Sequence, residues 1–433
     1  MKIPDEQQQE RFYTLYWQPM QDSLGSALPE AIRHFLMRHG ATIKQGDTYF
    51  ALKQQVEPKS DAETIAYLQE LARFAGYYAM LLHPERETDG NLRERLSRLN
   101  RLEVTVAYPF LLNIYDDFTN QRLTATAFAE ILDLLENFIL RRAVCNIQRS
   151  PLNKVFPLLH AQALQSASLI EGIRENLATK NYPHDADFRE AFISSSMYGN
   201  GARYVRTKLI LERLEAAAGS KEIVPFKDLS VEHVMPQTLT PWWKDHLGED
   251  YEQVHELLLH TIGNLTLTAY NSELSNSDFS HKRVLFAESH IGLNDWFQKS
   301  TTWNDEAIRI RAEALADRAL AIWPFFGKTQ TPSRGSTSGI TSKTPTRLVL
   351  LDQTFPVTTW RDVLQHTLQI ISDRDEDVFL AIAEQYPRYI SLDKNALRTT
   401  RQLSNGFFIE TNMSADSIDR LCRQVVEVAR AFS

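Results

Sequence analysis

Apolar residues recur at helical spacing through the first part of the chain, and this pattern limits the fold more than any other feature. Segments such as "DAETIAYLQELARFAGYYAMLL" and "TATAFAEILDLLENFILRRAVC" repeat apolar side chains three and four positions apart. Little of this stretch alternates with period two. Breaks at "HPERETDGN", "DDFTNQ" and "QRSPLN" divide it into pieces of helical length. The pattern predicts a helical domain over residues 1–195, arranged as a bundle.

The pattern changes after residue 195. "DLSVEHVMP" and "TIGNLTLT" are short and rich in β-branched residues, which is typical of strands, and helical spacing then returns. Residues 196–327 are therefore predicted to form a small mixed unit with two strands. Residues 328–346, rich in Ser, Thr, Gly and Pro, are predicted to be a flexible linker. Residues 347–433 are predicted to be a small α+β module, which makes the chain mainly α.

Bulk composition narrows the class of protein. The 433 residues include 43% hydrophobic and 24% charged residues, as expected for a folded chain of two or three domains. Two cysteines provide neither a disulfide framework nor a four-cysteine zinc site, which favours the cytoplasm. No apolar run approaches the ~20 residues of a membrane span, and the N-terminus lacks a signal-peptide core. The net charge of −8 argues against a general charge-driven nucleic-acid binder, so any DNA contact must be local.

An acidic residue and a histidine adjoin at the end of the first predicted strand. Hydrolysis of a phosphodiester needs a base for the water and a cation for the charge that develops on the phosphate. Histidine suits the base because its pKa lies near working pH, and oxygen ligands suit Mg²⁺. Neighbouring strand residues point to opposite faces, so Glu232 and His233 can serve a metal and a water if the strand end bends. Pro236 ends the strand.

The order of these motifs resembles the His-Me finger (HNH-like) nucleases, whose ββα-metal unit runs strand, loop, strand, helix. "EHVMP" and "GNLTL" match its two strands, and Asn271 falls where its helix starts. The longer segments "EHVMPQTLTPWW" and "HTIGNLTLTAYNSELSNSDFSHKR" are similar to the nuclease half of GmrSD-type modification-dependent (type IV) restriction enzymes. The flanking regions resemble that family in texture and order. Its N-terminal NTPase-like sensor domain has no counterpart, because the chain begins where that domain would end.

The resemblance implies a metal-dependent DNA endonuclease of bacterial anti-phage defence, which cleaves foreign or modified DNA. His233 would be the general base, and Glu232 and Asn271 would bind one Mg²⁺, with Mn²⁺ able to substitute. Asn264 would brace the loop that aims the histidine, and Lys282 would contact phosphate. The implied partners are DNA and an NTPase-like sensor domain or subunit, with no membrane.

Three arginines are predicted to contact nucleic acid. Arg283 follows Lys282, and Arg398 and Arg401 precede a predicted strand in the last module. Arg141, Arg142 and Arg149 lie in the helical region, and the sequence does not decide between phosphate contacts and ordinary surface charge.

Simpler interpretations stand beside each site residue. The Gly263–Asn264 pair suits a tight turn with positive φ, Asn271 suits a helix N-cap, and Lys282 suits a solvated helix face. At the level of function, the alternative is a catalytically inactive DNA- or partner-binding subunit that keeps the nuclease fold.

Zinc is the main alternative for the histidines in this region. "HELLLH" places His255 and His260 five residues apart, which turns the second away by about 140° at ~100° per residue. The metalloprotease motif needs two histidines four positions apart, on one helical face. We therefore expect His255 to be exposed and His260 to lie in a loop or at the rim of the site.

Overall fold

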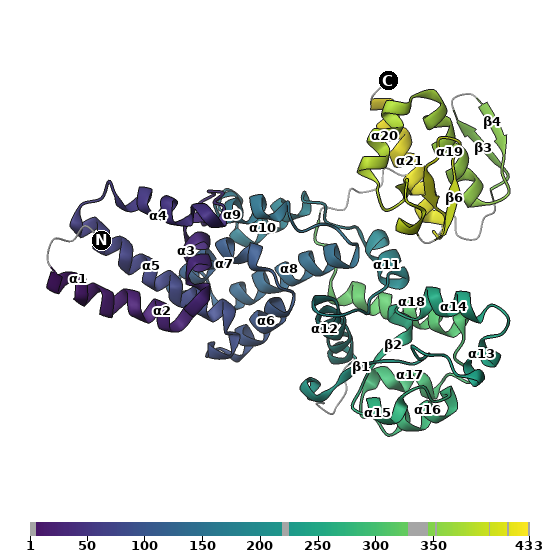
Figure 1. Ribbon diagram of the computed structural model, residues 1–433, viewed down its shortest axis with the longest axis horizontal. Helices are drawn as coiled ribbons and strands as arrows, with labels where there is room; N and C mark the ends of the chain where they lie inside the picture. Colours follow the sequence, from purple (N-terminus) through teal and green to yellow (C-terminus); the bar gives the residue numbers. More distant parts are fainter. Residues whose placement is uncertain are drawn as a thin grey trace. The chain divides into compact units, whose positions relative to one another are not determined.

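The protein folds as two compact units, Met1–Thr329 and Gln330–Ser433, and is mainly helical, as predicted (Figure 1). The computed structural model describes residues 6–218, 225–327, 345–350, 353–397, 399–413 and 415–431. The predicted linker, 328–346, lies outside the described residues except for its last two. The predicted division near residue 195 stays a prediction, since both sides of it belong to the first unit.

Helices make up the N-terminal part of the first unit, where the sequence pattern places them. Their bounds are α1 (Glu6–Phe12), the π-helical η1 (Tyr13–Trp17), α2 (Gln18–Leu24), η2 (Gly25–Ala27), α3 (Leu28–Met37), η3 (Gln45–Asp47), α4 (Thr48–Val56), α5 (Asp61–Leu82), η4 (Pro84–Arg86), α6 (Gly90–Arg101), η5 (Thr105–Ala107), α7 (Tyr108–Thr119), α8 (Ala125–Val144), α9 (Leu152–Ala163), α10 (Leu169–Ala178) and α11 (Asp185–Ser194). Local signals set several of these ends. Ser60 and Glu63, for example, form a reciprocal capping box at the start of α5.

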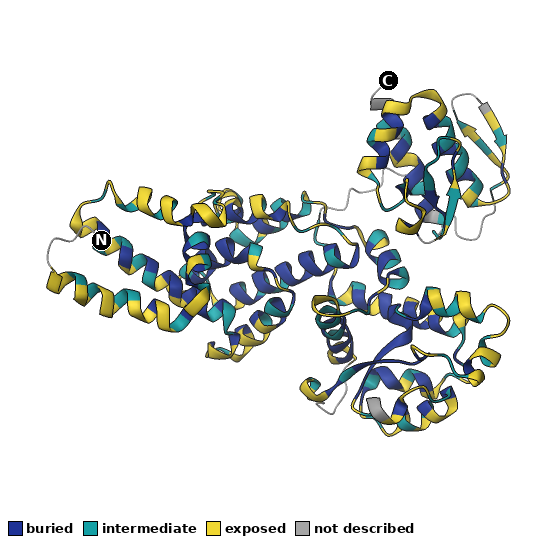
Figure 2. Cartoon of the chain, in the orientation of Figure 1, coloured by how far each residue is buried: buried dark blue, intermediate teal, exposed yellow. Residues whose placement is uncertain are grey.

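The core of this part runs along α5, α7 and α8. α5 packs on α7, α7 on α9, and α6 on α8. Phe110, Phe128 and Phe138 are fully buried in it, and Figure 2 shows the buried residues along the inward faces of these helices. Burial of aromatic side chains of this size is the main stabilising contribution.

The rest of the first unit contains two strands among helices. Its elements are α12 (Ala202–Ala217), η6 (Phe226–Asp228), β1 (Ser230–His233), α13 (Pro241–Leu247), α14 (Tyr251–Leu258), η7 (Ile262–Asn264), β2 (Leu265–Thr268), α15 (Asn271–Leu274), α16 (Phe279–Ala287), η8 (Gly292–Asn294), α17 (Asp295–Gln298) and α18 (Asp305–Ile322). β1 and β2 lie within the two segments predicted as strands, and they pair antiparallel. α12 contacts both strands, and α18 packs on η7 and α11.

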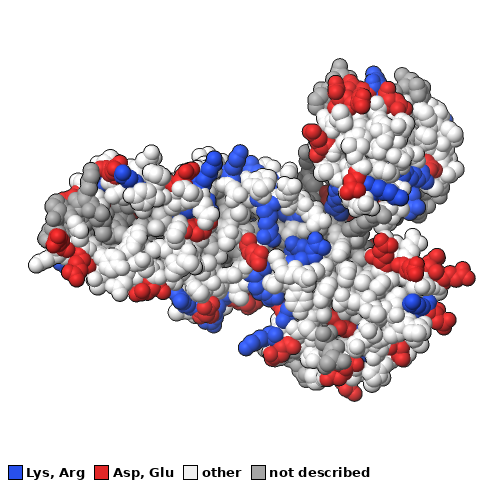
Figure 3. Space-filling model, in the orientation of Figure 1, with Lys and Arg blue, Asp and Glu red and all other residues white. Residues whose placement is uncertain are grey.

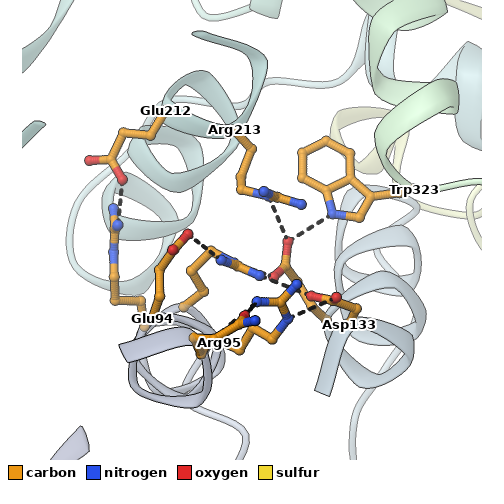
Figure 4. Close-up of polar contacts among 10 residues, drawn as sticks. Glu94, Arg95, Asp133, Glu212, Arg213 and Trp323 are labelled. Atoms are coloured by element: carbon orange, nitrogen blue, oxygen red, sulfur yellow. Dashed lines mark hydrogen bonds and ion pairs between the residues drawn. The ribbon is translucent and has the colours of Figure 1, made fainter. Parts of the chain in front are cut away.

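Ion pairs connect the helical part to α12, and a hydrogen bond connects it to Trp323, the residue after α18 (Figure 4). Glu136 of α8 accepts from Arg98 of α6 at 2.7 Å, from Arg213 of α12 at 3.2 Å, and from the indole N–H of Trp323 at 3.0 Å. Arg98 also bonds Asp133 at 2.9 Å. Every charge in this group has a partner, which is the condition for ionised groups to be tolerated in a protein interior.

Arg141 and Arg142 contribute to the interior of the first unit. Their exposed fractions are 0% and 3%. Arg141 donates to the backbone carbonyls of Trp323 and Pro183, at 2.7 and 2.9 Å for its two terminal nitrogens. Arg142 donates to the carbonyls of Asn181 and Gln148. Both roles weighed for these two residues, phosphate contact and surface charge, are therefore wrong.

The second unit is a small α+β module. Its elements are β3 (Arg347–Leu350), β4 (Gln353–Pro356), α19 (Trp360–Arg374), α20 (Glu376–Gln385), β5 (Ile390–Ser391), η10 (Lys394–Ala396), β6 (Thr400–Gln402), β7 (Phe408–Glu410) and α21 (Ala415–Ala431). β3 and β4 form a hairpin, and a three-stranded sheet has the order β5-β7-β6. Leu364, Phe379 and Ile409 are fully buried between the helices and this sheet. Over the described parts of both units, no helix combines the length and apolarity needed to cross a bilayer.

Candidate active site

The antiparallel pair of β1 and β2 places the candidate residues at one end of a buried two-stranded sheet. Glu232 lies opposite Thr266 and His233 opposite Leu265. All four residues of β2 are buried. The backbone N–H of Val234 donates to the carbonyl of Asn264 at 3.0 Å, so the pairing continues one step past the end of β1. Adjacent residues of a strand face opposite ways, and Glu232 and His233 accordingly have different partners.

His233 lies in a pocket of rings. Its Nε2 is 3.0 Å from Nδ1 of His260, and the edge of its ring meets Tyr198 with centroids 4.4 Å apart. Tyr198 also stacks on His260. Only 4% of His233 is exposed, and burial, with smaller contributions from His260 and Lys282, lowers its pKa to about 3. His233 is therefore neutral near pH 7, and the burial that keeps it neutral also makes it a weaker base than an exposed histidine.

Glu232 faces Lys282 on the other side of the strand. Nζ of Lys282 donates to Oε1 of Glu232 at 2.6 Å and to the carbonyl of His233 at 2.8 Å. Burial raises the pKa of Glu232 and lowers that of Lys282, while their ion pair opposes both shifts. Lys282 has no exposed surface, so the interpretation as a solvated helix face is wrong for it. The structure brings Lys282 to both candidate residues of β1.

Asn264 connects the backbone at Met235 and Leu259 with the indole of Trp303. Its Oδ1 accepts from the Met235 N–H at 2.7 Å and from the indole N–H of Trp303 at 3.1 Å. Its Nδ2 donates to the carbonyls of Met235 and Leu259, both at 2.9 Å. The side chain is fully buried with all four of its hydrogen-bonding positions used. This geometry fixes the chain directly after His233.

Gly263 and Arg311 complete the support of this turn, and the sequence patterns did not single out Arg311. Arg311 of α18 is fully buried, and its Nη1 donates to the carbonyls of Gly263 and Leu265 at 2.8 and 2.7 Å. Burial lowers its pKa to about 9. A Cβ on Gly263 would lie 2.2 Å from the Ile308 carbonyl oxygen. Gly263 is not among the residues with positive φ, so close approach to α18, and not turn geometry, requires glycine.

Of His255 and His260, one lies where it was expected and one does not. His260 lies in the turn after α14, beside His233, where a rim residue was expected. His255 is half-buried, and its Nε2 donates to the Pro236 carbonyl at 2.9 Å, so the expectation that it is exposed is wrong. Both imidazoles lie close enough to His233 to disfavour its protonated form.

The remaining predicted residues lie apart from the histidine pocket or are only partly described. Asn271 begins α15, and its side chain lies outside the described residues. Arg283 is half-buried on α16, and its Nε has no hydrogen-bond partner among the described groups. Arg398 lies outside the described residues. Arg401 pairs with Asp362 at 2.8 Å and donates to Gln365, so its guanidinium is engaged within its own unit.

The carboxylate oxygens of Glu232 are of the type that binds Mg²⁺ in proteins. Mg²⁺ is held in proteins by one or two carboxylates together with waters and substrate phosphates, and Glu232 supplies such a carboxylate. Oε1 of Glu232 also accepts from Lys282, so a cation would share this carboxylate with an ammonium group. Among the described residues, no three His, Cys, Asp or Glu side chains gather as a metal cluster of their own. A metal here would therefore depend on water and substrate for most of its ligands.

Comparison with known proteins adds an independent observation. Residues 182–318 match a family model described as GmrSD restriction endonucleases, C-terminal domain. The matched range contains α12 and both strands and ends within α18. It therefore includes every residue of the histidine pocket and of its support. No curated protein matches the chain.

Proposed function

We propose, from the premise that this chain is a GmrSD-type family member through residues 182–318, that it is a metal-dependent DNA endonuclease acting in restriction of foreign or modified DNA. The observation that carries the proposal is the geometry around His233. A neutral, buried histidine follows a carboxylate at the end of a strand, and a fully bonded asparagine fixes the backbone next to it. The helix α16 returns a lysine to the same strand end.

In the proposed reaction, His233 accepts a proton from water as the water oxygen attacks phosphorus. The new P–O bond forms as the bond to the leaving 3′ oxygen breaks, and that oxygen takes a proton from solvent. Mg²⁺ bound through Glu232 and Asn271 would supply charge neutralisation at the phosphate and the leaving oxygen. Lys282 holds the Glu232 carboxylate and the His233 carbonyl in place through its two hydrogen bonds.

The contact with His260 restricts which ring nitrogen of His233 can act. If His260 donated to Nε2, the hydrogen of His233 would be on Nδ1 and no lone pair would remain for water. The base is competent when Nε2–H of His233 donates to Nδ1 of His260 and Nδ1 of His233 is unprotonated. In that arrangement the acceptor nitrogen of His260 fixes the tautomer and the ring orientation of His233. His260 is thus proposed as a positioning residue.

Plasmid nicking in the presence of Mg²⁺ tests the base. Because general-base catalysis contributes roughly 10²- to 10⁴-fold, His233→Ala should slow nicking by that order. His83→Ala, which removes a partly exposed histidine of the helical part, is the matched control and should nick at the parental rate. Equal rates for His233→Ala and the parent would show that the base is misassigned.

His260→Ala and His260→Asn test the positioning role with the same assay. The asparagine amide can take the place of the Nδ1 acceptor, so it should recover part of the activity that alanine loses. A purely structural role would instead make the two variants equally slow and lower the thermal midpoint of both.

The close pairing of Glu232 with Lys282 favours a second candidate, a DNA- or partner-binding subunit that does not cleave. Titration with Mn²⁺ separates the two. The nuclease should bind Mn²⁺, more weakly in Glu232→Gln, and should cleave; the non-catalytic subunit should do neither. Cleavage of matched modified and unmodified phage DNA, with and without an NTPase-like sensor protein, would then establish which DNA is the substrate.

A further inference from the structure

Two arginines project from the N-terminal half of α12. Arg203 and Arg206 are three residues apart, so they share a face of the helix. Arg203 is exposed and Arg206 is half-buried. Nε of Arg206 is buried and has no hydrogen-bond partner among the described groups. These two residues and Arg149, which follows α8, form what we call the α12 arginine cluster.

The members of the α12 arginine cluster lie close enough to repel one another. The pKa of Arg206 is lowered first by burial and then by the charges of Arg149 and Arg203. Within the described residues, no ion pair joins any of the three to a carboxylate. The nearest hydrogen bond is from Arg149 to the backbone carbonyl of Glu103 at 3.3 Å. Three guanidinium groups without a counter-charge form an anion-binding surface.

This surface lies beside the histidine pocket. The charge of Arg203 disfavours protonation of His260. Tyr204, next to Arg203, accepts from the Val231 N–H of β1 at 3.4 Å, and its ring meets Tyr198. Thr207 of α12 donates to the Met197 carbonyl at 2.6 Å, and the Met197 N–H donates to the His260 carbonyl at 2.7 Å. The helix that carries the arginines is therefore fixed to the residues that surround His233.

Several other arginines of the first unit are not available to bind an anion, because their guanidinium groups bond other groups of the protein. Arg141 and Arg311 bond backbone carbonyls, and Arg213 pairs with Glu136. On the face drawn in Figure 3, Lys and Arg side chains gather over the middle of the first unit, whereas Asp and Glu are more frequent toward its ends. On a chain of net charge −8, such a concentration favours a polyanion at one place on the surface.

We propose that Arg149, Arg203 and Arg206 bind the phosphate backbone of the DNA strand on the His260 side of the site. The inference rests on the proposed function, since it assumes that the anion is the substrate. Position favours DNA over an acidic protein, because Arg203 lies close enough to His260 for its charge to act on that ring, and His260 contacts His233. Guanidinium groups also match phosphate geometry in a bidentate manner.

Binding of a short fluorescent duplex to the full chain, in the His233→Ala background, tests the surface without cleavage. Anisotropy is measured over roughly 50 to 200 mM salt, because each phosphate contact adds about 0.9 to the slope of log K against log salt. Arg149→Ala and Arg203→Ala should each lower the slope by about one. Arg203→Glu should weaken binding roughly tenfold or more. Arg206→Lys keeps the charge at a half-buried position and should keep the slope.

Arg11→Ala is the matched control, since it removes one exposed arginine of α1 at the far end of the helical part. Slopes of the cluster variants equal to that of Arg11→Ala would overturn the inference, whether or not the parent nicks plasmid. The cluster variants could lower the slope of log K against log salt while the parent fails to nick plasmid. That result would support the DNA-binding surface and contradict the proposed nuclease function. Cluster-dependent binding of labelled polyglutamate, with no duplex binding, would overturn the inference in favour of an acidic protein.

Discussion

Asn264 illustrates how much one side chain can determine at the residue scale. Its amide uses two donors and two lone-pair positions, and these bind both backbone groups of Met235, the Leu259 carbonyl and the Trp303 indole. An aspartate there would place an acceptor opposite two carbonyls, and an alanine would leave all of these groups unpaired. Buried polar groups without partners are costly, so this site tolerates little but asparagine.

Asn264→Ala should therefore destabilise the protein by about 3 kcal/mol or more, because four buried backbone and indole groups lose their partner. Urea unfolding followed by tryptophan fluorescence measures the change. Asn276→Ala, at an exposed asparagine in the same part of the chain, is the control and should unfold within about 0.5 kcal/mol of the parent. A similar midpoint for both variants would show that the four bonds contribute little.

His34 gives a pH dependence that is independent of the candidate site. It is 2% exposed; Nη2 of Arg33 donates to its Nε2 at 2.9 Å, and its Nδ1 is 3.2 Å from the Tyr78 hydroxyl. An arginine can only donate, so Nε2 of His34 carries no hydrogen and the ring is neutral. Burial is the main cause that lowers its pKa to about 4; the Arg33 charge lowers it further and Glu30 opposes the shift.

The unfolded chain binds a proton at His34 below about pH 6.5, whereas the folded chain does so only near pH 4. The contribution of His34 is thus complete above pH 6.5 and is lost as pH falls toward 4, by roughly 3 kcal/mol at most. His34→Gln should flatten the fall in unfolding free energy over this window. His83→Gln, at a partly exposed histidine, should leave the fall unchanged. An unchanged slope in His34→Gln would contradict the prediction.

At the scale of elements, the contact between α18 and η7 sets the position of the turn that contains Asn264. Gly263 lies against the backbone of Ile308, and Arg311, one turn further along α18, binds the carbonyls on either side of Asn264. The helix thus acts as a rigid support for the turn between α14 and β2. Loss of this contact would move Asn264 and, through it, the end of β1.

Gly263→Ala should separate the two elements, because the new Cβ would lie 2.2 Å from a backbone oxygen that cannot rotate away. We expect destabilisation by about 2 kcal/mol or more and a parallel loss of nicking activity. Gly76→Ala is the control: it lies inside α5 with no atom within 4 Å of the added Cβ, and should raise stability by about 0.5–1 kcal/mol. Equal stability of the two variants would show that α18 can move without cost.

At the scale of the whole molecule, the ion pairs around Glu136 join the helical part of the first unit to the part that carries the site. Glu136 is 2% exposed, and its partners come from α6, from α12 and from the residue after α18. The same α12 carries the arginine cluster and contacts both strands. The helical part is therefore built into the support of the site.

Glu136→Gln should lower stability by about 2–4 kcal/mol, because Arg98 and Arg213 would lose the charge that compensates them in a buried position. The control is Glu130→Gln, on the same helix as Glu136. It breaks the partly exposed ion pair of Glu130 with Arg174 of α10 and should cost at most about 1 kcal/mol. Thermal unfolding measures both. A midpoint change in Glu136→Gln no larger than in Glu130→Gln would mean that the network is not needed for the fold.

The sequence by itself determined where the helices and strands lie and in which order the candidate residues follow one another along the chain. Helical periodicity predicted the helices of the first 195 residues. The β-branched segments 228–236 and 261–268 contain β1 and β2 but extend beyond both strands. Such patterns reflect which face each side chain buries. The resemblance of "EHVMP" and "GNLTL" to a known family then placed His233 and Asn264 in one site. Local pattern is sufficient for such features, since spacing along the chain fixes them.

Only the tertiary structure decided which side chains meet. Lys282 lies 50 residues from Glu232 along the chain, and its burial depends on where α16 packs. Gly263 suggested a turn with positive φ, but the approach of Ile308 from a distant helix is what requires it. Arg141 suited either a phosphate contact or surface charge in the sequence, but the fold buries it, whereas Arg203 stays exposed near His260. Charge and residue type are local properties, whereas burial and partners come from segments that the chain brings together only on folding.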